Sequence, residues 1–452
     1  IPEKSVAVLP FVNMSSDKEQ EYFSDGLSDE LIQMLANVPD LRVPGRTSSF
    51  YFKGRNETLD TIAKQLKVAN VLEGSVRKAD GRLRVTADLV RSDNGYRLWS
   101  ATYDREAKDI FKVQDEIATA VVTALQAKLL PTGKVAARRT SSTDAYDQYL
   151  LALQFRKSAA TVESGRQAAA ALRKAIALDP NYAAAYAALA TTESFIADRT
   201  ADPASLKQAH ADAEKAIAIA PDEADGYAAR GYLRGAFSWD WVGAEADTKK
   251  ALSLNPADPE VQLTYATLLA ELGRLPEAID MSRMAVAADP LSNSGWALLG
   301  RFLISTNDFD GADAALRESL RIYPDNSVPL THLATLQLCR GQPTEALKTL
   351  GRIDDHQLEF YLVSAVQHSL GHSQESQAAL DQTIARYAQV EAYQIAETYA
   401  WRGEKDEAFN WLQRAYRQRD AGLGALKFDP LLANLRNDPR FTALLKQINL
   451  PP

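Results

Sequence analysis

The sequence predicts an α/β domain followed by an all-α superhelix of repeated helical hairpins, and three observations indicate this. Strand and helix patterns alternate in the order βαβαβββα over about the first 130 residues. Beyond residue 144 every periodic pattern is helical. In that second region prolines and small residues recur at an almost constant interval, which is typical of a repeat protein.

The elements of the first region follow from local patterns of apolar residues. In order, we expect a strand at 5–11, a helix at 19–37, a short strand at 41–43, a helix at 58–66 with Thr58 as its N-cap, strands at 71–78, 82–91 and 96–103, and a helix at 110–130. Asp80-Gly81 and Asn94-Gly95 separate the last three strands. Both dipeptides favour type I′ turns, so a three-stranded antiparallel meander is predicted.

The second region has a period close to 34 residues. Pro256, Pro290 and Pro324 are 34 residues apart, and Pro180 and Pro221 precede them in the same phase after small insertions near 199–205 and 238–241. Proline stops the second helix of a hairpin before the next unit begins.

The fullest copy of the repeat lies at residues 293–324. It reads Trp296-x-x-Leu299-Gly300-x-x-Leu303, followed by Ala312 and Leu316. This pattern resembles the tetratricopeptide repeat, in which small residues sit where two helices cross closely and large apolar residues fill the space between them.

The phase divides the chain into regions with definite boundaries. We expect an α/β domain at 1–131, a linker at 132–143, about seven to eight repeats at 144–420 and a capping segment at 421–452 with a helix at 439–448. The expected units are 149–180, 183–221, 224–256, 259–290, 293–324, 327–352, 357–388 and 389–420. The seventh is the weakest, because Ser376 stands where alanine is usual.

The first region also resembles a known family. The residues that carry the resemblance are Leu9-Pro10-Phe11, Glu21-Tyr22-Phe23-Ser24-Asp25-Gly26, Ser48-Ser49-Phe50, Lys53-Gly54, Val71-Leu72-Glu73-Gly74-Ser75-Val76-Arg77, Leu98-Trp99, Tyr103-Asp104-Arg105 and Gln114-Asp115-Glu116-Ile117. They are similar to the TolB-like N-terminal domain. This resemblance implies tetratricopeptide repeats downstream, and upstream an effector: a winged-helix DNA-binding domain in CadC/ToxR-like membrane-bound regulators, or a class III nucleotide cyclase. It implies no catalytic or ligand-binding residues.

Composition and charge exclude several functions. The net charge is −8, and residues 141–452 hold 30 basic against 40 acidic residues, so direct contact of this piece with nucleic acid is disfavoured. No apolar stretch is long enough to span a bilayer. The first residue is Ile1, so we expect a processed or excised chain whose membrane contact, if any, lies in a missing upstream segment.

The sequence contains no motif that predicts an enzyme, a cofactor site or a metal site. His368 and His372 have a metal-ligand spacing, but Gly371 is expected to break the helix between them. Ser75 and Lys78 fit S-x-x-K formally, yet a strand would place them on opposite faces. Cys339, the only cysteine, is expected to pack inside a repeat helix. Gly422 and Gly424 are expected to end a helix.

A protein or peptide partner is expected in the concave groove lined by the first helices of the repeats. The residues predicted to face it are Tyr232, Glu260, Thr267, Glu271, Arg301, Thr335, Tyr361, His368, Tyr393, Glu397 and Trp401. For each of them, packing against a neighbouring helix is the alternative interpretation. Trp239 and Trp241 form a second candidate surface, or plug a joint between units. In the aromatic run 50–52 at least one ring must leave the core if the run is a strand, and that ring would dock the repeats or a partner.

Three functions remain open at this point. The first is a non-enzymatic sensory or interaction region of a bacterial signalling or transcription-regulatory protein, in the periplasm as the soluble part of an inner-membrane protein or in the cytoplasm. The second is a free-standing scaffold that assembles a protein complex. The third is an enzyme hidden in the first domain. A homodimer is compatible with regulators, which usually act as pairs, although no residue pattern requires one.

Overall fold

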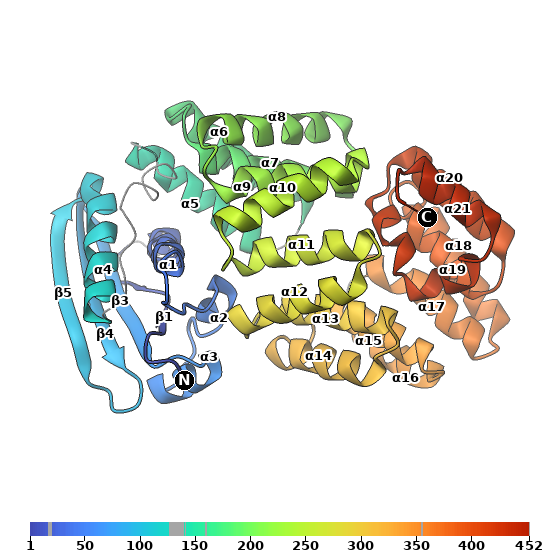
Figure 1. Ribbon diagram of the computed structural model, residues 1–452, viewed down its shortest axis with the longest axis horizontal. Coiled ribbons are helices and arrows are strands. Elements are labelled where there is room, and N and C mark those ends of the chain that lie inside the picture. The colour runs from blue at the N-terminus through green and yellow to red at the C-terminus, as the bar shows by residue number, and fades with distance from the viewer. Residues whose placement is uncertain (17–19, 126–139, 141, 159–160, 354–355, 452) are drawn as a thin grey trace.

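The computed structural model describes residues 1–16, 20–125, 140, 142–158, 161–353 and 356–451. A sheet region containing the N-terminus lies at one end, the helical hairpins follow, and the last hairpins lie at the other end (Figure 1). The predicted architecture of a small sheet-bearing region followed by helical hairpins is therefore confirmed.

One mixed sheet forms the centre of the first region. Its strands are β1 (Val6–Val8), β2 (Val12–Asn13), β3 (Asn70–Ala79), β4 (Arg82–Arg91) and β5 (Arg97–Glu106). β1 and β2 both run parallel to β3 along one edge, whereas β3, β4 and β5 form the predicted antiparallel meander. The strand predicted at 5–11 is divided in two at Leu9-Pro10-Phe11.

The two predicted hairpin turns have different outcomes. Asp80 and Gly81 have φ values of 49° and 73°, as a type I′ turn requires. At the second turn only Gly95 has a positive φ, because a longer loop closes between Arg91 and Tyr96 through the bond from Arg91 N to Tyr96 O (2.8 Å). A strand at 41–43 was wrongly predicted: Arg42 makes only an isolated bridge to Ser5.

Within the described residues, four α-helices accompany the sheet. They are α1 (Glu21–Ala36), α2 (Arg46–Phe50), α3 (Leu59–Leu66) and α4 (Ile110–Ala124). Thr58 caps α3 by accepting a hydrogen bond from Thr61 N, as predicted. α1 and α4 bury their apolar stripes against β3 and β4, where Leu83 and Leu89 are fully buried. The end of the helix predicted at 110–130 and most of the linker predicted at 132–143 lie outside the described residues.

Eight helical hairpins follow in the described part of the chain. Their helix pairs are α5 (Thr143–Ser158) and α6 (Val162–Leu178), α7 (Ala183–Thr200) and α8 (Pro203–Ile219), α9 (Ala224–Leu233) and α10 (Trp241–Leu254), α11 (Pro259–Glu271) and α12 (Leu275–Ala288), α13 (Asn293–Ser305) and α14 (Phe309–Ile322), α15 (Ser327–Cys339) and α16 (Pro343–Leu350), α17 (His356–Ser369) and α18 (Ser373–Tyr387), and α19 (Ala392–Trp401) and α20 (Lys405–Gln418). In the seventh hairpin Ser376 replaces the usual alanine without loss of packing, because Ser376 and Ser364 each donate to the other's carbonyl oxygen at 2.8 Å.

Gly300 shows why the repeat needs a small residue at this point. A Cβ atom at Gly300 would lie 2.6 Å from Cγ of Leu316, which is fully buried between α13 and α14. The Gly300→Ala substitution should therefore lower the free energy of unfolding by about 1 kcal/mol or more, because overpacking outweighs the gain of about 1 kcal/mol in helix propensity. Urea unfolding measures this. Gly351→Ala is the matched control, since a Cβ there meets neighbours only at 3.5 Å; equal midpoints for the two variants would contradict the packing argument.

The first domain docks on the repeats at two places. α1 packs on α5, where Gly26 makes room for Leu150. The segment around α2 packs on the corner between α12 and α13: Ser48 N donates to Asp289 (2.8 Å) and Leu291 N donates to the Ser48 hydroxyl (2.7 Å).

The aromatic run 50–52 belongs to this second interface. It continues α2 instead of forming a strand. Phe52 lies in an apolar cluster with Leu291 and Ile322, and Tyr51 contacts Tyr323 edge-on at 6.3 Å. Of the two roles expected for an outward ring, docking the repeats is therefore the one that the structure shows.

Ser48 and Ser49 offer a test of this interface. Both are fully buried, but the Ser49 hydroxyl has no hydrogen-bond partner, whereas the Ser48 hydroxyl accepts the buried Leu291 N–H. Ser48→Ala should lower the free energy of unfolding by about 1–3 kcal/mol, because Leu291 N–H is left unpaired. Ser49→Ala should change it by less than about 0.5 kcal/mol. Urea denaturation of both variants checks this, and an equal loss in both would refute the assignment.

Candidate functional site

The C-terminal segment, residues 421–450, folds back along the inner face of the hairpins. It comprises the short 3₁₀ helices η6 (Ala421–Lys427) and η7 (Pro430–Leu435) and the helix α21 (Pro439–Gln447), which confirms the helix predicted at 439–448. Gly422 and Gly424 do not end a helix as expected. They lie in η6, where a Cβ atom would meet Tyr393 and Glu271, so η6 approaches both side chains closely.

The C-terminal segment reaches helices that are distant in sequence. The Phe428 ring contacts Phe302 edge-on at 5.6 Å, and the guanidinium carbon of Arg301 lies 4.9 Å from the centre of the Phe428 ring. Lys427 Nζ approaches Leu272 O at 3.4 Å. The segment therefore forms one wall of the concave face in addition to covering the last hairpin.

Trp239 and Trp241 hold the far end of this segment. Trp241 Nε1 donates to Ile448 O at 2.6 Å, and both indoles are almost fully buried. Trp239 stacks on Tyr416 at 5.1 Å between ring centres and lies under the Arg419 guanidinium at 4.2 Å. Of the two interpretations of this pair, the plug between units is the one that the structure supports.

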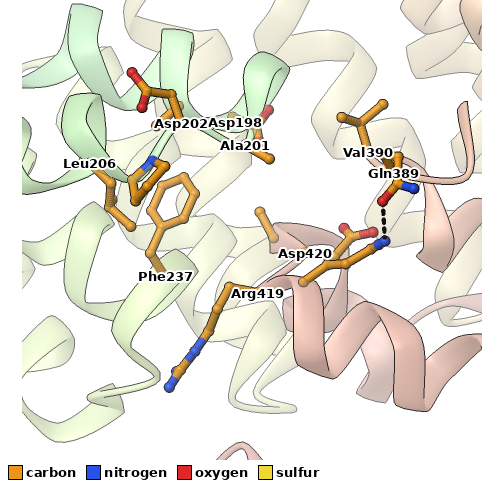
Figure 2. A pocket seen from close by; sticks show the side chains of 13 residues that line it. Asp198, Ala201, Asp202, Leu206, Phe237, Gln389, Val390, Arg419 and Asp420 are labelled. Atoms are coloured by element: carbon orange, nitrogen blue, oxygen red, sulfur yellow. Dashed lines mark hydrogen bonds between the residues drawn. The ribbon is translucent and has the colours of Figure 1, made fainter.

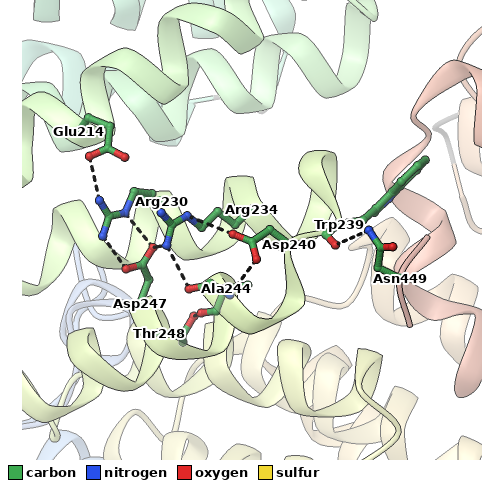
Figure 3. Close-up of polar contacts among 10 residues, drawn as sticks. Glu214, Arg230, Arg234, Trp239, Asp240, Ala244, Asp247, Thr248 and Asn449 are labelled. Atoms are coloured by element: carbon green, nitrogen blue, oxygen red, sulfur yellow. Dashed lines mark hydrogen bonds and ion pairs between the residues drawn. The ribbon is translucent and has the colours of Figure 1, made fainter. Parts of the chain in front are cut away.

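A polar network fixes the turn that presents these tryptophans (Figure 3). Arg230 makes two hydrogen bonds to Asp247, at 2.8 and 2.7 Å, and one to Glu214 at 2.8 Å. Arg234 pairs with the same Asp247 at 2.8 Å, at the start of a π-helical turn over Arg234–Ser238. Asp247 is buried, so its two arginines are needed to neutralise it.

Trp241 and Trp401 form a matched pair for testing this anchor. The Trp241→Phe substitution should lower the free energy of unfolding by about 1–3 kcal/mol, because it leaves the buried Ile448 carbonyl without a donor. Trp401 donates to Ser369 Oγ at an exposed position, so Trp401→Phe should have a smaller effect. Thermal unfolding of both variants measures the difference; a larger loss for Trp401→Phe would be inconsistent with the anchor.

A concave pocket of about 390 Å³ lies on the inner face between α9, α11, α13 and α15. Five of the predicted groove residues line it: Tyr232, Glu260, Thr267, Glu271 and Arg301. Thr264, Ser294, Leu298 and His332, which the sequence did not single out, also face it. Its volume falls in the range typical of ligand pockets.

The charged groups of the concave pocket carry shifted pKa values. Burial raises the pKa of the Glu271 carboxyl to about 7, although the nearby Arg301 opposes this. Enclosure by the surrounding helices, with the charges of Asp258 and Asp289, raises the pKa of Glu260 to about 6. Burial and Arg301 lower the pKa of His332 to about 3, so this imidazole is neutral at physiological pH.

The other predicted groove residues lie deeper or farther along the superhelix. Tyr361, Tyr393 and Glu397 are buried against the C-terminal segment, so they serve packing in this structure. His368 is exposed near the end of α17, and Trp401 is half-buried. Thr335, on α15, is buried and donates to Thr331 O.

Two buried carboxyl groups meet where α19 contacts η7. Tyr393 donates its hydroxyl to Asp429 at 2.9 Å. Burial raises the pKa of Glu397 well above its usual range, and the charge of Asp429 and a hydrogen bond to it raise it further, whereas Arg301 opposes the shift. A protonated Glu397 that shares its proton with Asp429 explains how both groups tolerate burial.

A second, smaller pocket of about 170 Å³ lies between the α7–α8 turn and the junction of α20 with η6 (Figure 2). Asp198 faces it from α7 and Asp420 from the opposite side. Burial raises the pKa of Asp420 to about 6, and the charge of Asp198 adds to the shift. Asp420 already accepts bonds from Tyr393 N and Gly422 N, so it mainly fixes the start of η6.

The structure shows where the residues of the candidate catalytic and metal-binding motifs lie. His372 precedes α18 and contacts Gln367 at 2.9 Å, beyond the turn at Gly371, whose φ is 81°. Among the described residues no group of three or more histidine, cysteine or carboxylate side chains is arranged to hold a metal ion. Burial raises the pKa of the Cys339 thiol to about 11, which disfavours a nucleophilic thiolate. Lys78 pairs with Asp147 at 2.6 Å.

Comparison with known proteins identifies the repeats. Residues 240–302 and 294–326 match the tetratricopeptide repeat, so this chain contains repeats of the type that generally bind proteins or peptides. A protein of Rhizobium meliloti (strain 1021) named "Putative adenylate cyclase 3" is 40% identical over 198 residues, which make up 42% of this chain and 32% of that protein. The chain thus spans about a third of the length of this curated relative.

Similar solved structures include further repeat proteins. PilF of Pseudomonas aeruginosa is 19% identical, with a TM-score of 0.37, and the match covers 46% of this chain and 93% of PilF. A thermophilic tetratricopeptide-repeat protein of Thermus thermophilus is 18% identical, with a TM-score of 0.37, covering 43% and 99% of the two chains. Both TM-scores lie below 0.5, so neither likeness defines the function or overall shape of this chain. Among the described residues no helix has the length and apolar character needed to cross a bilayer.

Proposed function

We propose that this chain is a non-enzymatic interaction region of a bacterial signalling or transcription-regulatory protein, which binds a protein or peptide in the concave pocket and relays the binding to an upstream effector. The observation that carries the binding function is the pocket itself. It lies on the inner face of four consecutive hairpins, and Arg301, which lines it from α13, packs on the Phe428 ring of the C-terminal segment. A preformed site loses little conformational freedom when a ligand enters.

Tyr232 is the side chain best placed to anchor such a ligand. It lines the pocket from α9 and is 42% exposed, while one edge of its ring packs on Phe237 at 6.1 Å. Half-exposed tyrosines on a rigid surface are frequent energetic centres of binding sites, because they bury a large area at little entropic cost.

Selection of random displayed peptides on the full chain tests this binding site. We expect enriched peptides whose affinity falls at least about tenfold in Tyr232→Ala, which corresponds to one anchor contact. Tyr96→Ala is the control, because Tyr96 is 72% exposed in the sheet domain, away from the pocket. Absence of any enriched peptide, or equal binding by Tyr232→Ala, would count against the proposal.

The signalling part of the proposal rests on the N-terminal resemblance and on the curated relative. The TolB-like resemblance implies an effector upstream, either a winged-helix domain or a class III cyclase. The name of the relative, "Putative adenylate cyclase 3", favours the cyclase. A free-standing scaffold is the alternative. The proposed compartment is the periplasm when a membrane segment separates chain and effector, and the cytoplasm otherwise.

The reading frame that encodes this chain decides between these possibilities. Sequencing about 300 codons upstream of Ile1 should reveal a cyclase or winged-helix domain, since effector domains are typically about 50–250 residues long. An initiator methionine immediately before Ile1 would contradict the relay and leave the scaffold.

A further inference from the structure

The concave pocket has a charge pattern that specifies the chemistry of its ligand. Glu260, Thr264, Thr267 and Glu271 follow the i, i+4, i+7, i+11 spacing and therefore share one face of α11, which lines the pocket. Eleven residues of helix place the two carboxyl-bearing residues about 16 Å apart along the axis. In the described part of the chain neither carboxylate forms an ion pair or a side-chain hydrogen bond.

The positive charge of Arg301 acts largely on groups other than Glu271. Its guanidinium lies over the Phe428 ring and opposes the raised pKa of Glu397 in the carboxyl pair with Asp429. The charge of Arg301 is thus shared between Glu271 on one side and the carboxyl groups of Glu397 and Asp429 on the other. Among the described residues that line the concave pocket, two carboxylates, those of Glu260 and Glu271, are matched by one cationic side chain, that of Arg301.

We propose that the concave pocket binds an extended basic peptide segment, with a lysine or arginine side chain against Glu271 and a second cationic group near Glu260. This inference rests on the proposed function and names its ligand class. An extended chain advances about 3.3 Å per residue, so basic residues four or five positions apart span the two carboxylates. The hydroxyls of Thr264 and Thr267 already donate to main-chain oxygens of α11, which leaves the carboxylates as the strong acceptors of the wall.

The protonation of Glu271 gives this ligand class a characteristic pH dependence. Its pKa of about 7 means that the carboxyl is mostly neutral below about pH 6 and mostly ionised above about pH 8. A cation binds the ionised form, so affinity should rise with pH. The titratable groups that interact electrostatically with Glu271 are Tyr232 on α9 and Arg301 on α13. Lys427, the last residue of η6, directs its ammonium group to Leu272 O. Burial raises the pKa of Tyr232 and lowers that of Lys427.

Glu260 lies at the other end of α11, among charged neighbours of both signs. Arg156 on α5 and Arg46 on α2 oppose the rise of its pKa, which the charges of Asp258 and Asp289 reinforce. Because this end is more balanced, Glu271 is the carboxylate whose removal should have the larger effect.

The peptide selection described above tests the class of ligand separately from the existence of the binding site. We expect peptides enriched in lysine or arginine at two positions four or five residues apart. Enrichment of neutral or acidic peptides whose binding still requires Tyr232 would leave the proposed function standing and overturn the basic ligand. Failure to select any Tyr232-dependent peptide would instead remove the proposed function.

A double-mutant cycle with a selected lysine-containing peptide tests the contact between Glu271 and the peptide lysine directly. Glu271→Gln should weaken binding at least about tenfold, and replacing the critical lysine by the neutral norleucine should weaken it similarly, with little further loss when both changes are combined. Glu375→Gln, on exposed α18, should leave affinity unchanged. Circular dichroism confirms folding of each variant.

The same peptide measured by calorimetry at several pH values completes the test. Affinity should increase about tenfold between about pH 5.5 and pH 7.5, and Glu271→Gln should flatten this profile. A pH-independent affinity in the wild-type chain, or an additive effect of the two substitutions in the cycle, would overturn the assignment of Glu271.

Discussion

The hydrogen bond from Trp241 Nε1 to Ile448 O, together with the Phe428 ring between Phe302 and Arg301, joins the end of the chain to its middle. In a stack of helical hairpins each unit ordinarily contacts only its neighbours, so curvature is set by small local rotations. Here residues 207 positions apart are in direct contact. That closure covers part of the inner face and contacts the concave pocket through Arg301, which packs on Phe428.

The closure also has electrostatic consequences. It places Asp429 beside Glu397 and brings Lys427 and Phe428 to the inner wall, where Arg301 is the central cation. Burial without full pairing raises the pKa values of acidic groups along this wall. The inner face therefore holds carboxylates that ionise more fully when a cation approaches, which couples ligand charge to protonation.

Much of the fold could be predicted from local sequence patterns, because those patterns express local physics. The prolines, the small residues such as Gly300 and the Asp80-Gly81 turn each act over a few residues, and each lies where it was expected. The prediction of a short strand at 41–43 was wrong, because Arg42 makes one isolated bridge to Ser5 instead of a ladder of backbone hydrogen bonds. Residues 421–435 have no helical or strand period, so nothing local indicated that they return to the inner face.

The same distinction between local patterns and long-range contacts explains which residues of the candidate site could be predicted. The repeat phase correctly predicted that Tyr232, Glu271 and Arg301 face the groove, and all three line one pocket. It could not show that Tyr393 and Glu397, at equivalent positions, are covered by the chain's own C-terminal segment. His332 and Thr264 were missed, although they follow the same phase: they lie 34 residues on either side of Leu298, one position per repeat, and all three line the pocket.

Hydrogen–deuterium exchange of the intact chain measures the closure most directly. Peptides covering residues 421–450 should exchange as slowly as those covering α11 and α13, because their amide groups open only when the inner face opens. Trp241→Phe should speed exchange in the C-terminal segment and in α11 together. Rapid exchange of residues 421–450 in the wild-type chain, with α11 and α13 still protected, would show that the segment does not hold the inner face and would contradict the account.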